Sequence, residues 1–224
     1  MRTAKVKLYA FEELSDEAKK RAHANWLNEG HYHFWAGDAR ATIRAFESEF
    51  GVTIRNWHYD SSGYGYDIDF GDISDEVLEL SGNRARAWIW NNHGDILLEP
   101  SVSYLHDSVR RRSRVFFDRV YDGTCPFTGV CFDCDALDPI AYFAFGVEWS
   151  EKEKRRVASS RRLAADDATT IMDLIDACVD SLFKSLRKDC EEQETIEYFA
   201  EHCAANDYEF DEDGELWTGK EVAA

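Results

Sequence analysis

Three cysteines near the middle of the chain have a spacing that could bind zinc. Cys125, Cys131 and Cys134 form a Cys-x5-Cys-x2-Cys pattern, and His31 and His33 could add ligands from a distance. Zinc in structural sites takes four nitrogen or sulfur ligands arranged as a tetrahedron. Because the sequence lacks a second Cys-x2-Cys pair and an His-x3-His pair, a packed loop of thiols without a metal is the favoured interpretation.

Carboxylates offer two other ways to bind a cation. Five aspartates could surround a divalent ion, as in a metal-dependent hydrolase: Asp60, Asp67, Asp69, Asp72 and Asp75. A polar strand face is the simpler interpretation of this group. Further along, EFDEDGELWTGK places Glu209, Asp211 and Asp213 at positions one, three and five of an EF-hand loop. Lys220 stands at position twelve, where that loop needs a bidentate acid, so this segment is predicted to be a hairpin.

No motif in the sequence identifies a catalytic reaction. Glycine-rich phosphate loops are absent, and no motif joins Cys125 to any of the seven histidines as a nucleophile and its base. We therefore predict a protein that is not an enzyme and that needs no cofactor or metal.

The strongest chemical signal is a concentration of acidic residues toward the C-terminus. Residues 166–216 contain 17 acidic and three basic residues, a net charge of −14, whereas the whole chain carries −18. A rigid row of carboxylates on a helix could dock into a basic groove and speed association. A solvated face of an ordinary amphipathic helix is the alternative. The candidate partner-binding surface comprises six acidic residues: Asp166, Asp173, Asp176, Asp180, Glu191 and Glu194.

The overall charge and the absence of apolar runs exclude several classes of partner. A charge of −18 argues against direct binding to nucleic-acid phosphates, which requires a basic patch. No apolar run reaches the roughly 18 residues needed to span a bilayer, and the start MRTAKVKLYAFEELSDE lacks a signal-peptide hydrophobic region. We therefore expect a cytoplasmic protein with reduced cysteines and no membrane partner.

The N-terminal part of the chain is predicted to contain a short strand and two helices. Alternating apolar residues predict the strand within residues 1–10. Ser15 is a suitable N-cap for the first helix, which Gly30 would end. A second helix is predicted over about residues 38–50, where apolar residues recur on one face.

The centre of the chain changes to a period-two pattern that is typical of strands. Tyr64, Tyr66, Ile68 and Phe70 alternate with glycine and aspartate, and the preceding SSG predicts a hairpin turn. Two more strands are predicted around the flanks of NNHGD, which would give an antiparallel sheet of three or four strands. A loosely periodic helix is predicted next, and the segment GTCPFTGVCFDCD is predicted to be irregular. The residue ranges are 88–90 and 96–98 for the strands and 100–120 for the helix.

The C-terminal part is predicted to be a long helix followed by a hairpin. The Asp138-Pro139 step predicts one helix start. The long helix would run from Asp167 to about Ala205, with a break near residues 192–195, and the hairpin would turn at Asp213-Gly214. The buried stripe of the long helix would contain Ile171, Ile175, Cys178, Leu182 and Leu186. Together these patterns predict a single α+β domain over residues 1–224, with N-terminal helices, a small antiparallel sheet, the long acidic helix and the hairpin.

Three segments resemble a loose group of small acidic proteins that bacteriophages and prophages encode and that are often labelled antitoxin-like. They are FEELSDEAKKRAHANWLNEG, NWHYDSSGYGYDIDF and AANDYEFDEDGELW. A fourth segment, CPFTGVCFDCDALDPI, is similar to one in small phage proteins, and together the four cover about a third of the chain. The resemblance implies a phage or prophage genome as the source. It transfers no catalytic residue, because the group has no established activity.

These observations lead to three hypotheses about function. The first is a non-catalytic inhibitor of a host nucleic-acid-binding factor, such as a CRISPR or restriction complex, which it would bind as an acidic mimic of nucleic acid. The second is an antitoxin that neutralises a cognate toxin, and the third is a metal-dependent hydrolase. Under the first, reversing Asp173, Asp176 and Asp180 to lysine is expected to slow association and to leave the fold intact.

Overall fold

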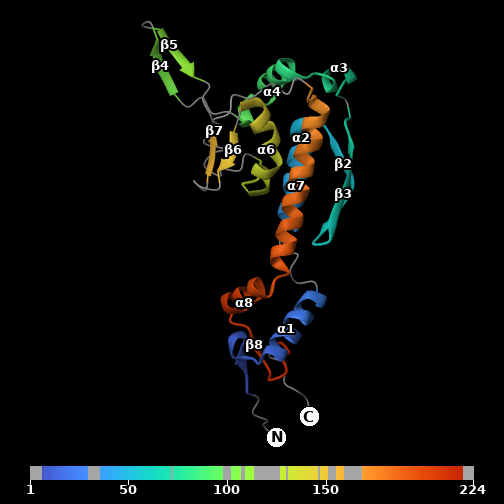
Figure 1. Ribbon diagram of the computed structural model, residues 1–224, viewed down its shortest axis with the longest axis vertical. Coiled ribbons are helices and arrows are strands. Elements are labelled where there is room, and N and C mark those ends of the chain that lie inside the picture. The colour runs from blue at the N-terminus through green and yellow to red at the C-terminus, as the bar shows by residue number, and fades with distance from the viewer. Residues whose placement is uncertain are drawn as a thin grey trace. The chain divides into compact units, whose positions relative to one another are not determined.

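The protein is an α+β protein whose contacts group into two compact units (Figure 1). The computed structural model describes residues 7–29, 36–71, 73–97, 102–106, 109–113, 127–129, 131–145, 147–150, 155–158 and 168–218. Residues Met1–Phe34 and Lys188–Ala224 form the first unit, here called the terminal unit, and Trp35–Arg187 form the central unit. The single domain stays a prediction, and its division into two units is a feature that the sequence analysis did not anticipate.

Helices supply most of the core of the central unit. They are α2 (Ala36–Phe50), α4 (Gly82–Leu97), α6 (Cys131–Phe145) and α7 (Ile171–Gln193), whose end belongs to the terminal unit. The short helix α3 (Asp75–Leu78) has no buried residue. The five residues of the predicted stripe on α7 are all buried, so that prediction is confirmed. The residues that are most deeply buried with them come from α2, α4 and α6: Phe46, Ile89, Leu137 and Ile140.

A β-hairpin lies beside α7 (Figure 1), and its aromatic side chains pack against that helix. Strands β2 (Thr53–Asp60) and β3 (Gly63–Asp69) pair antiparallel, and Ile54 lies opposite Ile68. Tyr64 and Tyr66 stack on Phe183 of α7, with ring centroids 6.2 and 5.2 Å away. The period-two pattern and the turn at SSG are therefore confirmed.

Two predictions for the residues after this hairpin are wrong. Residues 88–90 and 96–97 lie in the helix α4 instead of in strands, because Ala85 and Ile89, one turn apart, are its buried positions. The predicted helix over residues 100–120 is instead a pair of antiparallel strands where the structure describes it. These strands are β4 (Val102–His106) and β5 (Val109–Ser113), and a further pair is β6 (Val147–Ser150) with β7 (Arg155–Ala158). The sheet of three or four strands is thus replaced by separate two-stranded sheets.

Helix α6 begins seven residues before the predicted start at Asp138. It starts at Cys131 and contains Pro139 in its interior, so part of the segment predicted to be irregular is helical. The reason lies in Asp133, in the first turn of α6, because its buried side chain accepts hydrogen bonds from the loop at residues 127–129. This network fixes the start of the helix before the proline is reached.

The terminal unit joins the two ends of the described chain around a small core. Its elements are β1 (Tyr9–Ala10), η1 (Phe11–Glu13), α1 (Asp16–Glu29), α8 (Ile196–Ala205) and β8 (Glu209–Phe210). Strands β1 and β8 pair antiparallel, with Tyr9 opposite Phe210. The core is formed by Phe11, Leu14, Ala18, Ala22, Trp26, Phe199, Cys203 and Phe210.

The N-cap of α1 and the break in the long C-terminal helix agree with the predictions, whereas that helix starts at Ile171 and not at Asp167. The Ser15 hydroxyl accepts a hydrogen bond from the Ala18 amide at 3.2 Å, as expected of an N-cap. The break in the long C-terminal helix lies between α7 and α8, where Thr195 caps α8 by accepting from the Tyr198 amide. The hairpin is confirmed by the bridge between Phe210 and Leu216.

In the parts of the chain that the structure describes, no helix is both long and apolar enough to cross a membrane.

Candidate functional site

The first of the acidic residues predicted from α7 has a local structural role. Asp173 accepts hydrogen bonds from the Thr170 amide at 3.0 Å and from its hydroxyl at 2.7 Å. The Thr170 hydroxyl in turn accepts from the Asp173 amide at 3.1 Å. This reciprocal pair closes the first turn of the helix. Asp166 lies outside the described residues.

Asp176 and Asp180 hold the β-hairpin against α7. The Tyr66 hydroxyl donates to Asp176 at 3.3 Å, and the Tyr64 hydroxyl donates to Asp180 at 2.7 Å. Asp180 also forms an ion pair with Lys184 at 2.6 Å. Lysines at these positions would remove both acceptors, so charge reversal would also weaken the contact between the hairpin and α7, and the expectation that it leaves the fold intact stays a prediction.

The contact between the hairpin and α7 also shifts the pKa values of Asp180, Tyr64 and Tyr66. Burial raises the pKa of the Asp180 carboxyl, but the bonds from Lys184 and Tyr64 outweigh it and hold that pKa below its usual value. Burial and the Asp180 carboxylate raise the pKa of Tyr64, and burial and Asp176 do the same for Tyr66. Both hydroxyls therefore remain donors over the physiological pH range.

The remaining two candidates, Glu191 and Glu194, belong to the terminal unit. Glu191 is exposed and Glu194 is half-buried. The backbone carbonyl of Glu194 lies 2.9 Å from Nε2 of His23, a contact that ties the start of α8 to α1. The structure therefore divides the predicted acidic surface between two units instead of presenting it as one helical row.

Negative charge is concentrated on the terminal unit. Its described residues, 7–29 and 188–218, include 17 acidic and five basic residues, which gives a net charge of −12. Fourteen of the 17 acidic residues are exposed. Arg21 and Asp213 form an ion pair within these residues, at 2.9 Å, and both of its side chains are largely exposed. Five basic residues cannot neutralise 17 acidic ones, so the unit keeps a net negative charge, and most of its carboxylates are exposed to solvent.

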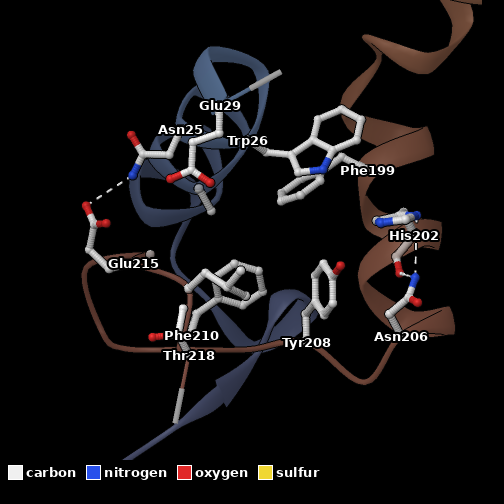
Figure 2. Close-up of a pocket in the computed structure, with 13 residues that line it drawn as sticks. Asn25, Trp26, Glu29, Phe199, His202, Asn206, Tyr208, Phe210, Glu215 and Thr218 are labelled. Atoms are coloured by element: carbon white, nitrogen blue, oxygen red, sulfur yellow. Dashed lines mark hydrogen bonds between the residues drawn. The ribbon is translucent and has the colours of Figure 1, made fainter. Parts of the chain in front are cut away.

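A pocket of about 480 Å³ opens in the same unit, between α1, α8 and the C-terminal hairpin (Figure 2). Trp26, Phe199 and Phe210 form its apolar floor, and the rings of Trp26 and Phe199 lie 5.0 Å apart. Tyr208 and His202 form one wall, with their rings 5.5 Å apart at nearly a right angle. This volume lies within the range of pockets that bind small organic groups, about 300–1,000 Å³.

Polar side chains form the opposite edge of this pocket. Glu29 and Glu215 are both exposed carboxylates that line it, and neither a lysine nor an arginine is among its lining residues. The Asn25 amide donates to Glu215 at 3.0 Å and so links α1 to the hairpin (Figure 2). The pocket therefore combines an aromatic floor with a negatively charged edge.

No local sequence pattern indicates this pocket. The sequence predicts the helix after Ser15 and the hairpin at Asp213-Gly214 as separate elements. Their meeting depends on pairing between the two ends of the chain, between β1 and β8, for which a single sequence carries no local signal.

Gly214 positions the hairpin against α1, and its replacement tests this arrangement. Gly214 has φ of +88°, and a Cβ there would overlap the backbone carbonyl oxygen of Ala18. Gly214→Ala is expected to lower the free energy of unfolding by about 2–3 kcal/mol, because both the positive φ and the overlap oppose a side chain. Urea unfolding followed by circular dichroism would measure this loss.

Gly37→Ala is the matched control, because a Cβ at Gly37 meets nothing within 4 Å and its φ is not positive. That variant should unfold at the wild-type urea concentration or slightly above it. Equal stability of the Gly214→Ala protein and the wild type would contradict the described seating of the hairpin.

The candidate metal ligands are not brought together where the structure describes them. Among these residues, no group of three or more histidine, cysteine, aspartate or glutamate side chains could hold a metal ion. Cys134 is buried in α6, whereas His31, His33, Cys125 and the side chain of Cys131 lie outside the described residues. The zinc interpretation therefore stays untested.

The aspartates of the hairpin are separated and serve local contacts. Asp60 accepts from the Ser62 hydroxyl and from the amides of Ser62 and Gly63, and these bonds lower its pKa. Asp69 pairs with Arg55 at 2.5 Å, at the other end of the hairpin. The two ends are separated by the length of β3, which has seven residues and spans about 20 Å of extended chain. The Asn56 side-chain amide donates a hydrogen bond to Asp67 at 2.8 Å. Asp75 is in the first turn of α3, and Asp72 lies outside the described residues.

The segment that imitates an EF-hand loop is closed by its own backbone. Asp211 accepts hydrogen bonds from the amides of Asp213 and Glu215, both at 2.9 Å. The prediction of a hairpin is confirmed, with Glu209 in β8 and Lys220 beyond the described residues.

The cysteines that the structure describes with their side chains are buried thiols. They are Cys134, Cys178, Cys190 and Cys203, and none of them forms a disulfide. Burial raises the pKa of Cys178 and raises that of Cys203 to about 12. Since the thiolate is the nucleophilic form, these two side chains are unreactive at neutral pH.

Comparisons of the chain with protein-family models, with curated proteins and with solved structures gave no match.

Proposed function

We propose that this protein is a non-catalytic inhibitor, encoded by a phage or prophage, that binds a nucleic-acid-binding factor of its bacterial host in the cytoplasm. The terminal unit would be the docking surface, and a basic groove of the host factor would be its target. A defence complex of the CRISPR or restriction type fits this description, since such a complex must expose a basic groove to bind its nucleic acid.

The observation that carries the proposal is the net negative charge of the terminal unit. A net charge of −12 over 54 described residues creates a field that attracts a basic surface before contact. Such attraction acts mainly on the rate of association, and salt screens it over about 8 Å at physiological ionic strength. An inhibitor that works by occupying a groove needs this charge and a complementary shape, and it needs no reacting group.

The test is capture of the partner from host lysate with the tagged full-length protein, followed by mass spectrometry and binding kinetics. We expect the captured protein to bind nucleic acid, and we expect duplex DNA or RNA to compete with its capture. Glu201→Lys with Glu212→Lys should slow association by about tenfold, because both glutamates are exposed on the terminal unit.

The matched control reverses two exposed glutamates of the central unit, Glu76 and Glu79, to lysine. This pair changes the net charge by the same amount, so it should leave association within about twofold of wild type if the terminal unit docks. Equal slowing by both pairs would contradict the proposed surface. Capture of a toxin that has no nucleic-acid-binding groove would contradict the inhibitor hypothesis and support the antitoxin hypothesis.

A further inference from the structure

We propose that the pocket of the terminal unit receives an arginine side chain of the protein partner. The inference rests on the proposed function, because it assigns a specific anchor to the acidic docking surface. It concerns a single site on that surface and not the charge of the unit as a whole.

The lining of the pocket favours a cation. Two carboxylates, Glu29 and Glu215, lie at its edge, and its lining residues include no lysine or arginine. Trp26 and Tyr208 supply aromatic rings, whose faces attract cations electrostatically. An anionic ligand would meet repulsion from the edge and from a unit with a net charge of −12.

The apolar floor distinguishes arginine from a smaller or more strongly hydrated cation. Trp26, Phe199 and Phe210 line the pocket and belong to the hydrophobic core of the unit, so the base of the pocket is apolar and suits an aliphatic chain. Arginine buries its methylene groups on such a surface while its charged end stays at the edge. Its planar guanidinium also stacks on aromatic rings and binds carboxylates in a bidentate manner, which the ammonium of lysine cannot do.

Neighbouring contacts hold the edge in place for this role. The bond from Asn25 to Glu215 fixes the glutamate on the hairpin to α1, and Gly214 seats the adjacent turn against Ala18. Glu29 comes from the last turn of the same helix. Both carboxylates are therefore carried by elements that are joined to one another.

The experiment titrates the full-length protein with the peptide acetyl-Gly-Arg-Gly-amide and follows assigned NMR signals. We expect saturable shifts of the indole N–H of Trp26 and of the backbone amides of His202 and Tyr208. The citrulline peptide, a neutral isostere, should bind at least about tenfold more weakly, because it lacks the charge. The lysine peptide should also bind more weakly than the arginine peptide.

Paired variants separate the pocket from the general charge of the unit. Glu29→Gln with Glu215→Gln should weaken arginine binding by about tenfold, since glutamine keeps the shape and the Asn25 bond but removes the charge. Glu12→Gln with Glu197→Gln removes the same charge from two exposed residues of the unit that do not line the pocket. That control should change binding by less than about twofold.

Three results would overturn the inference: no saturable shift at the pocket, equal binding of the citrulline or lysine peptide, or equal weakening by both pairs of variants. Each of them leaves the proposed function standing if the lysine substitutions at Glu201 and Glu212 still slow association with the captured partner. Conversely, the arginine peptide could bind in the pocket while the lysine substitutions at Glu201 and Glu212 leave association with the captured partner unchanged. That result would contradict the proposed function and leave the inference about the pocket standing.

Discussion

Asp133→Ala is expected to lower the free energy of unfolding by about 3–5 kcal/mol. The Asp133 side chain is fully buried and accepts five hydrogen bonds. Three come from the amides of Phe127, Thr128 and Gly129, and two from the hydroxyls of Thr128 and Thr42. Alanine would leave these donors without their acceptor inside the protein, where an unsatisfied polar group is costly. Urea unfolding followed by circular dichroism measures the loss.

Asp16→Ala provides the control for this variant. Asp16, like Asp133, is in the first turn of a helix, but it is exposed at the start of α1. Its replacement should cost only the interaction with the helix dipole, about 0.3–1 kcal/mol. A similar small loss for both variants would show that the Asp133 network does not stabilise the loop and the start of α6.

Asp133 also shows why part of the fold could not be predicted from the sequence. The Asp138-Pro139 step is a recognised local signal for a helix start, and it led to a start seven residues too late. The residues that decide the true start include Thr42, which is 91 positions away in the sequence. Only the assembled structure places its hydroxyl beside Asp133, so the local signal was overruled by a long-range contact.

The patterns that succeeded depend on neighbours in the sequence. The stripe on α7 repeats every three or four residues, and the cap at Ser15 is recognisable from three residues of context. The strand pair around SSG has a clear period of two over its second strand. In α4, by contrast, half-buried Trp88 and Trp90 suggested a strand, and the small buried Ala85 gave too weak a signal for the helical period.

The acidic residues of α7 show the same limit at the candidate site. Their spacing correctly placed Asp173, Asp176 and Asp180 away from the buried stripe. Composition could not indicate that Tyr64 and Tyr66 would donate hydrogen bonds to two of them, because the hairpin that carries these tyrosines is over 100 positions away. The exposed negative charge is therefore concentrated on the terminal unit, and no local sequence pattern indicates that α1 packs against α8.

Leu182→Ala tests the core that the sequence did predict, and it is expected to lower the free energy of unfolding by about 2–5 kcal/mol. Leu182 is completely buried on α7, and its neighbour Phe183 carries the stacked tyrosines of the hairpin. Removing its isobutyl group forfeits the transfer free energy and leaves a cavity that the surrounding helices fill only in part. The same urea experiment measures this loss, and an unchanged dependence on urea would show that the unfolded state is unaffected.

Met172→Ala is the control that distinguishes the loss of buried surface from a change in helix propensity. Met172 lies on the same helix but is 45% exposed, and alanine is as good a helix former as methionine or better. Met172→Ala should therefore change the free energy of unfolding by less than about 0.5 kcal/mol. If Leu182→Ala were equally mild, α7 would not form the centre of the core. The hairpin tyrosines would then lose the packed surface on which their bonds to Asp176 and Asp180 depend.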